Sequence, residues 1–73
     1  MASFSSRIAE LRKERKLKQR EMAGICGVKI RTYQGYEYGE NYPEIPGLLV
    51  IADYFNVSLD YLMGRTDKRE VNR

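Results

Sequence analysis

A chain of 73 residues, of which 42% are hydrophobic, has room for one small domain with one core. A single cysteine cannot form an internal disulfide, and without histidine the chain offers no zinc set, so no metal and no cofactor are expected. The net charge is +3. Neither a bilayer-spanning run of ~20 apolar residues nor the apolar region of a signal peptide is seen in the sequence, and the free cysteine fits a reducing compartment. We therefore expect a cytoplasmic protein.

Apolar residues at helical spacing predict five short helices and no strand, so the expected fold class is all-α. The first helix is expected from about Ser6 to Lys16, with Ser5 or Ser6 as its N-cap. Its apolar positions are Phe4, Ile8 and Leu11. The second is expected over residues 19–26, because Gly27 can adopt the left-handed conformation that ends a helix. Its inward residues would be Met22, Ala23 and Cys26, which makes Cys26 a buried structural thiol.

The third helix is expected from about Lys29 to Tyr38, and Gly39 would close it. Its inner face would carry Thr32, Tyr33 and Tyr36. After a loop rich in Gly, Asn and Pro, a fourth helix is expected to start between Glu44 and Pro46 and to end before Asn56. Its apolar stripe would be formed by Ile45, Leu48, Leu49, Ala52 and Phe55.

A single turn over residues 59–63 is the fifth predicted helix, with Ser58 as its N-cap and Val57 as a buried link before it. Residues 65–73 are polar and are expected to fray. The expected organisation is therefore one domain, residues 1–67, followed by a polar C-terminal tail, residues 68–73.

The charges are distributed unevenly along the chain. Residues 1–31 carry nine Lys or Arg against three Glu, whereas residues 32–64 carry five acidic residues and no Lys or Arg. The basic part suits an anionic partner such as nucleic acid, although a solvated basic face would have the same composition. The acidic part is compatible with a surface that faces protein.

Residues 19–38 fit the requirements of a helix-turn-helix, in which two short helices cross at roughly 90–120° and are joined by a tight turn. Ala23 is small where the two helices would cross, Gly27 supplies the turn, and Val28 fills the space beneath it. Tyr33 and Tyr36 would pack the third helix onto the first two.

Over roughly residues 4–67 the chain resembles the lambda-repressor-like, Cro-type helix-turn-helix domains, also called the xenobiotic response element family. The matching segments are Arg7-Ile-Ala-Glu-Leu-Arg-Lys-Glu-Arg, Gln19, Glu21-Met-Ala, Gly27-Val28, Thr32, Tyr36-Glu37, Gly39, Pro43, Ile51-Ala-Asp and Asn56-Val-Ser-Leu-Asp-Tyr-Leu-Met-Gly-Arg-Thr-Asp. The resemblance implies a compact five-helix domain whose third helix lies in the major groove of double-stranded DNA. It also implies a bacterial or phage transcriptional regulator, in many members a repressor, and a homodimer on paired half-sites would compensate for the small surface of one module.

By this resemblance the residues expected to contact DNA bases are Lys29, Ile30, Arg31, Gln34 and Gly35. Arg31 can grip guanine O6 and N7 with two hydrogen bonds, and Gln34 either pairs with adenine or binds a phosphate. Ile30 either contacts a thymine methyl group or is a scattered surface residue. At Gly35, where the family often has a long polar side chain, either the backbone approaches DNA closely or the contact is missing.

The residues expected to contact DNA phosphates are Lys18, Gln19, Arg20, Arg7, Arg12, Tyr38 and Tyr42. Gln19 opens the second helix, where free N–H groups favour an anion. The two tyrosines either donate their hydroxyl groups to phosphates or cover the core with their rings. Glu37 is expected to pair with a cation of the first or second helix, with Arg12 as the candidate.

Lys18 and Lys29 occupy the N-cap positions, where the family usually has Ser or Thr. Losing such a cap typically costs ~1 kcal/mol, and a cation at the positive end of a helix adds to that cost. Either tertiary packing tolerates the loss, or each lysine faces a DNA phosphate whose charge removes the penalty.

Two other classes of function are alternatives to a DNA-binding regulator. An antitoxin-like or adaptor module would use the same fold to bind another protein, and the acidic middle segment is compatible with it. An enzyme is not expected, because the chain has no histidine, its lone cysteine has no evident base, and its carboxylates are scattered. No pocket for a small-molecule ligand is evident either.

Overall fold

The computed structural model describes residues 2–71, which form five α-helices and no strand. The helices are α1 (Phe4–Glu14), α2 (Gln19–Cys26), α3 (Ile30–Tyr38), α4 (Ile45–Phe55) and α5 (Leu59–Leu62). The all-α prediction is therefore confirmed. Within the described residues no helix is long and apolar enough to cross a membrane.

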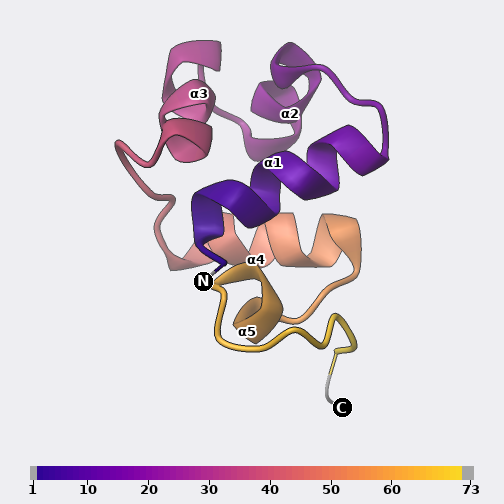
Figure 1. Ribbon diagram of the computed structural model, residues 1–73. Helices are drawn as coiled ribbons and strands as arrows, with labels where there is room; N and C mark the ends of the chain where they lie inside the picture. Colours follow the sequence, from indigo (N-terminus) through magenta and orange to yellow (C-terminus); the bar gives the residue numbers. More distant parts are fainter. Residues whose placement is uncertain (1, 72–73) are drawn as a thin grey trace.

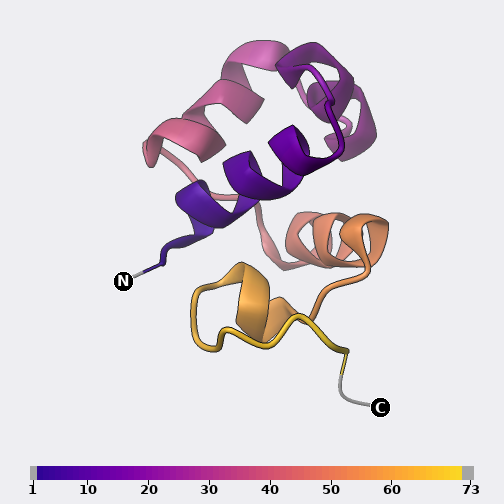
Figure 2. The same cartoon turned by 45° about the vertical axis from the view of Figure 1, so that its right-hand side comes forward.

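The helices are stacked along one direction of the molecule. Figures 1 and 2 show α2 and α3 at one end, α1 and α4 in the middle, and α5 with the C-terminal segment at the other end. Both α2 and α1 pack against α3, while α5 packs against α1 and α4. This arrangement leaves the outer side of α3 uncovered at its own end of the molecule.

One hydrophobic core holds the five helices together. Its most deeply buried side chains are Ile8, Met22, Tyr33, Ile51 and Leu62, one from each helix. Aromatic rings extend this core, because Tyr36 packs edge-on against both Phe4 and Tyr33. The predicted packing of Tyr33 and Tyr36 and the predicted burial of the link residue Val57 are confirmed.

The first helix begins two residues earlier than the sequence predicted. Ser3, rather than Ser5 or Ser6, is the N-cap, and it accepts a hydrogen bond from the Ser6 N–H while the Ser6 hydroxyl accepts one from the Ser3 N–H. The helix also ends earlier, at Glu14, because Lys16 adopts a left-handed conformation with φ of 56°.

The buried face of α4 differs from the predicted stripe. Ala52 and Phe55 are buried as predicted and Leu48 is half-buried, but Ile51 is fully buried, and Ile45 and Leu49 point to solvent. Because α4 is apolar almost all round, periodicity alone does not choose its inner face.

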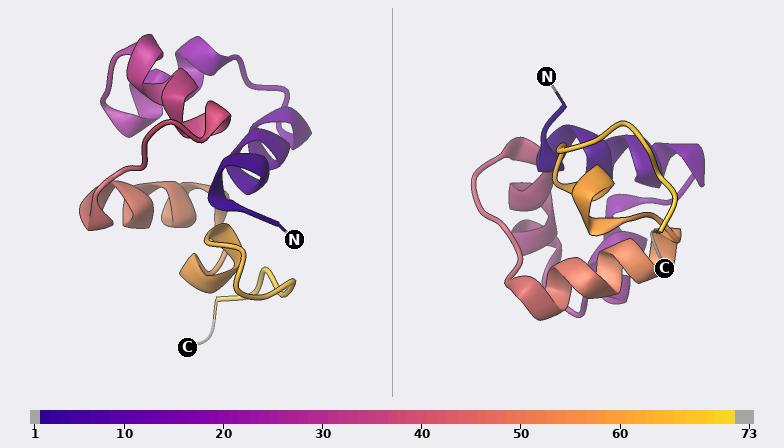
Figure 3. Two further views of the ribbon diagram at one scale, coloured as in Figure 1. Left: turned by 60° about the vertical axis from the view of Figure 1, so that its left-hand side comes forward. Right: turned by 90° about the horizontal axis from the view of Figure 1, so that it is seen from below.

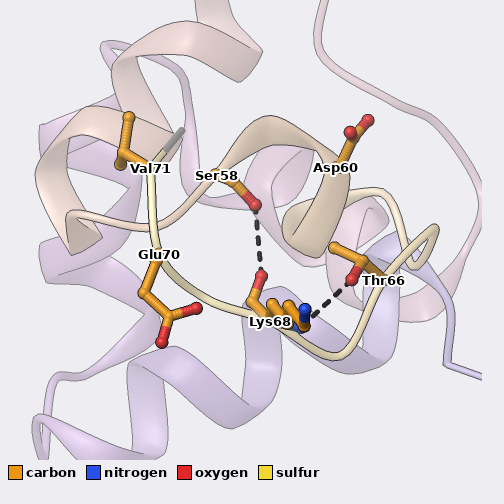
Figure 4. Close-up of a pocket in the computed structure, with 6 residues that line it drawn as sticks. All are labelled: Ser58, Asp60, Thr66, Lys68, Glu70 and Val71. Atoms are coloured by element: carbon orange, nitrogen blue, oxygen red, sulfur yellow. Dashed lines mark hydrogen bonds between the residues drawn. The ribbon is translucent and has the colours of Figure 1, made fainter. Parts of the chain in front are cut away.

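The C-terminal segment lies along α5 and α1 and is hydrogen-bonded to them through Asp67, Lys68 and Arg69. The Ser58 N–H donates to the Arg69 carbonyl at 2.9 Å. The Ser58 hydroxyl donates to the Lys68 carbonyl at 3.3 Å, as Figure 4 shows. The Arg69 guanidinium reaches Glu14 of α1, with Nη1 2.9 Å from Oε1. Figure 3 shows this segment crossing the molecule beside α5. The last two residues of the predicted tail, 72–73, lie outside the described residues.

Candidate nucleic-acid interface

The turn between α2 and α3 has the geometry that a helix-turn-helix requires. Gly27 adopts the left-handed conformation with φ of 69°, and the Val28 N–H donates to the Ala23 carbonyl at 3.0 Å, which ends α2. Val28 is half-buried against the core beneath this turn. The predicted bounds of α2 and the role of Gly27 are confirmed, and α3 begins at Ile30 with Lys29 as its N-cap.

The first turn of α3 presents a cationic and apolar surface to solvent. Lys29 and Arg31 are exposed, and Ile30 between them is 44% exposed. Within residues 2–71 no carboxylate pairs with either cation. These three sequence-predicted site residues therefore lie together on one uncovered surface.

Gln34 and Gln19 join this surface to the interior through a series of hydrogen bonds. The Gln34 Nε2 donates to the Gln19 Oε1 at 3.1 Å, and the Gln19 Nε2 donates to the Glu37 Oε1 at 3.1 Å. Gln19 opens α2, so the first residue of that helix is tied to α3 at two points. Both glutamines are half-buried.

Glu37 is the centre of this polar network. Its side chain is 6% exposed and accepts two hydrogen bonds from Arg12, with Nε 2.6 Å from Oε2 and Nη2 3.2 Å from Oε1. The Tyr33 hydroxyl donates to the same carboxylate. The predicted pairing of Glu37 with Arg12 is confirmed, whereas the further contacts to Gln19 and Tyr33 were not predicted.

The hydrogen-bond network around Glu37 stabilises the charged forms of Glu37 and Arg12. Burial by itself would raise the pKa of the Glu37 carboxyl, yet its hydrogen-bond donors and the Arg12 charge together hold that pKa below its usual value. The hydrogen bond to Glu37 raises the pKa of Arg12. Burial, and then the hydrogen bond to Glu37, raise the pKa of the Tyr33 phenol. Tyr33 therefore stays a neutral donor and Glu37 a charged acceptor near neutral pH.

Gly35 does not lie on the uncovered surface, which favours the second of the two sequence-based alternatives, that the DNA contact at this position is missing. The glycine is buried under the Asn41 side chain, and a Cβ at this position would stand 1.8 Å from the Asn41 Oδ1. The Gly35 carbonyl accepts the Glu40 N–H at 2.9 Å, which folds the following loop back over α3. Asn41 was not identified from the sequence, since a polar loop residue carries no signal of this contact.

The N-terminus of α2 carries exposed cations next to α3. Lys18 and Arg20 are exposed, and neither has a carboxylate partner in the described chain. Neither Lys18 nor Lys29 caps its helix with its side chain. Glu21 supplies half of a capping box, because its carboxylate accepts the Lys18 N–H at 2.9 Å.

Arg7 and Arg12 were expected to contact phosphates, but their guanidinium groups are used inside the domain. Arg7 is 6% exposed, stacks over the Tyr61 ring at 3.8 Å and donates to Asp67 at 2.9 Å. Arg12 is held by Glu37 and also donates to the Leu17 carbonyl at 2.8 Å. We therefore leave both arginines out of the candidate interface.

The remaining site candidates are two tyrosines after α3 and one cysteine in α2. Tyr38 is 63% exposed, and Tyr42 is 59% exposed while its ring packs against Phe4 at a centroid distance of 5.7 Å. Cys26 is half-buried, and burial raises the pKa of its thiol to about 11. A thiol of this kind is a poor nucleophile, which fits the expected structural role. Among residues 2–71 no group of His, Cys, Asp or Glu could hold a metal ion.

Comparison with known proteins identifies the family. The helix-turn-helix family model matches residues 8–62. The chain is 34% identical over 64 residues to the HTH-type transcriptional regulator AnsR of Bacillus subtilis (strain 168), which covers 88% of this chain and 55% of that protein. It is 38% identical over 69 residues to the cryptic phage CTXphi transcriptional repressor RstR of Vibrio cholerae serotype O1, which covers 92% of this chain and 62% of that protein.

A solved structure has the same arrangement of helices. The P22 c2 repressor protein, in complex with the synthetic operator 9T, superposes with a TM-score of 0.82 at 26% identity, covering 90% of this chain and 100% of that one. The chain spans between 52% and 62% of the length of the curated relatives that it matches. The chain belongs to the helix-turn-helix family and has the lambda-repressor-like fold.

Proposed function

We propose that this protein is a sequence-specific, double-stranded-DNA-binding transcriptional regulator, a repressor, which inserts α3 into the major groove. The observation that carries the proposal is the uncovered first turn of α3. Lys29, Ile30 and Arg31 are exposed there, and neither cation pairs with a carboxylate of the described residues. The relatives named as transcriptional regulators and repressors support it. Residues 1–67 are the DNA-binding domain in this proposal, and residues 68–73 its tail.

In this proposal, some residues of the interface contact bases and others contact phosphates. Arg31 and Lys29 read guanine edges, and Ile30 contacts a thymine methyl group. Lys18, Arg20 and the N-terminus of α2 hold a phosphate, and the exposed hydroxyl groups of Tyr38 and Tyr42 hold others. The protein acts by binding and not by catalysis, in the cytoplasm where its DNA is found.

We further propose that two copies bind paired half-sites about one helical turn, ~34 Å, apart. Two observations support a self-association surface away from α3. Exposed apolar side chains gather on α4 and after it, and this part of the sequence has no Lys or Arg. The residues concerned are Ile45, Leu49, Val50, Leu59 and Met63. Sedimentation that finds a monomer both free and on a two-half-site duplex would contradict this part of the proposal.

Binding-site selection from random duplex DNA, repeated at two salt concentrations, tests the proposed function. We expect a palindromic consensus with spaced half-sites and an affinity that falls with salt, because phosphate contacts release counterions. Salt-sensitive retention without any consensus would contradict sequence-specific regulation. It would favour an adaptor role instead, and a partner protein would then be sought.

A further inference from the structure

Two hydrogen bonds link Gln34 to Glu37 through Gln19, and the donor and acceptor of each bond are fixed by the Glu37 carboxylate. An ionised carboxylate can only accept, so Gln19 must turn its Nε2 toward Glu37, where the two atoms lie 3.1 Å apart. The Gln19 Oε1 then faces α3, and as an acceptor it can bond only to a hydrogen-bond donor. The Gln34 Nε2 donates to it at 3.1 Å. The charge of Glu37 thereby fixes which end of each amide points where.

The other end of the Gln34 amide is left available to a ligand. The Gln34 Oε1 has no hydrogen-bond partner within residues 2–71, yet it is not among the buried polar atoms that lack a partner, so it is open to solvent. Gln34 lies four residues after Ile30 and three after Arg31, which places it on the same face of α3. The surface proposed to face the major groove therefore includes a hydrogen-bond acceptor of fixed orientation.

We propose that Gln34 is a specificity-determining residue that accepts a hydrogen bond from the exocyclic amine of a base, adenine N6 or cytosine N4. Gln19 and Glu37 are its positioning residues. In the major groove these two amines are the only hydrogen-bond donors of the base edges, whereas a phosphate offers only acceptors and does not match an outward carbonyl. The inference rests on the proposed function and deepens it.

The first test asks whether Gln34 reads an amine. Binding-site selection with the wild type and with Gln34→Ala locates the base pair whose preference depends on Gln34. Duplexes carrying N6-methyladenine or N4-methylcytosine at that pair, in one strand and then in the other, then block the amine. We expect about tenfold weaker binding by the wild type for one strand only, and no comparable loss for Gln34→Ala.

The second test asks whether Gln19 sets the orientation of the amide. In Gln19→Lys the ammonium still donates to Glu37 but cannot accept from Gln34, so Gln34 turns its carbonyl inward and presents its Nε2 to the groove. We expect the preferred pair at the Gln34 position to reverse from an amine to a carbonyl on the contacted strand. Gln19→Met, which neither donates nor accepts, loses the preference there. The base pair read by Arg31 stays unchanged in both variants and is the internal control.

Each outcome separates this inference from the proposed function. A wild-type consensus in which no position depends on Gln34, or amine methylation that weakens wild type and Gln34→Ala equally, overturns the amine contact and leaves the regulator intact. Gln19→Lys with the wild-type preference at the Gln34 position overturns the positioning role. Selection of no consensus by the wild type overturns the proposed function itself.

Discussion

The three arginines of α1 and α3 differ in the contacts that their guanidinium groups make inside the domain. Arg7 is occupied by Asp67 and the Tyr61 ring, and Arg12 by Glu37 and a backbone carbonyl. Arg31 is exposed and pairs with no carboxylate of residues 2–71. Charge alone makes the three equivalent in the sequence, and only the tertiary contacts separate two structural cations from one that can bind a ligand.

We expect Arg31→Ala to weaken binding to the selected site by ~1–3 kcal/mol and to relax specificity at one base pair. The substitution removes the hydrogen bonds of the Arg31 guanidinium to a base edge, whereas the phosphate contacts of the other residues stay in place. Competition titrations against duplexes varied at each position measure both effects. Arg65→Ala is the matched control, because its side chain is exposed at the other end of the molecule. Equal weakening on all duplexes would show that Arg31 contacts a phosphate instead.

We expect Glu37→Gln to lower the free energy of unfolding by about 3 kcal/mol or more at neutral pH. The neutral amide keeps the shape of the side chain, but it leaves the guanidinium of Arg12 half-buried without its charge partner. Urea denaturation measures the change. Glu40→Gln removes one carboxylate from an exposed position nearby, and its effect should stay within about 0.5 kcal/mol. Equal effects of the two substitutions would contradict a structural role for the ion pair.

At the scale of single helices, the sequence predicts an element well where a local signal marks each end. The bounds of α2 are correct to the residue, because Gly27 and the start at Gln19 are both local features. The sequence predicts the start of α1 two residues late, because Ser3, Ser5 and Ser6 are all suitable N-cap residues and only the structure shows Ser3 in that role. In α4 the apolar residues lie all round, so the choice of Ile51 over Ile45 depends on packing with other helices.

The same distinction applies to the candidate site. The positions of Lys29, Ile30 and Arg31 follow from the helix-turn-helix register, which the sequence contains. The burial of Gly35 under Asn41 depends on how the loop after α3 folds back, and the link from Glu37 through Gln19 to Gln34 joins residues of two helices. No spacing in the sequence encodes these contacts, because they need the tertiary structure to bring the side chains together.

Lys18→Ser should make α2 more stable and the proposed DNA complex weaker. A serine at the N-cap completes the capping box with Glu21, which we expect to add ~1 kcal/mol to the free energy of unfolding. The lost cation should weaken binding to all sequences alike and reduce the salt slope by ~1. Denaturation and salt titrations measure the two effects on the same variant.

Lys18→Ala separates the two effects. It removes the same charge without supplying a cap, so it should reproduce the change in salt slope but not the gain in stability. A salt slope that stays at the wild-type value in both variants would place Lys18 outside the interface.

Across the whole molecule, α1 is held to its neighbours by ion pairs on more than one side. Arg12 joins it to α3 through Glu37, Arg7 joins it to the C-terminal segment through Asp67, and Arg69 reaches Glu14 from that same segment. The Glu37 pair is sheltered on both sides, whereas the Asp67 carboxylate and both members of the Glu14 pair are exposed to solvent, so these two pairs contribute less. The packing of a small core is therefore supplemented by contacts that need ionised carboxylates.

The stability of the domain should consequently fall in acid. The pKa of Glu37 is lowered in the folded state, and the hydrogen bond from Arg69 lowers the pKa of Glu14. A carboxyl with a depressed folded-state pKa contributes stability above its unfolded value, about 4.3, and loses it as pH falls through the folded value. We expect the wild-type thermal midpoint to hold between pH 7 and about pH 5 and to drop below about pH 4. Glu37→Gln, measured by circular dichroism over the same range, should start lower and fall less steeply, since it has already lost the group that titrates. Parallel curves for the two proteins would assign the acid sensitivity to other carboxylates.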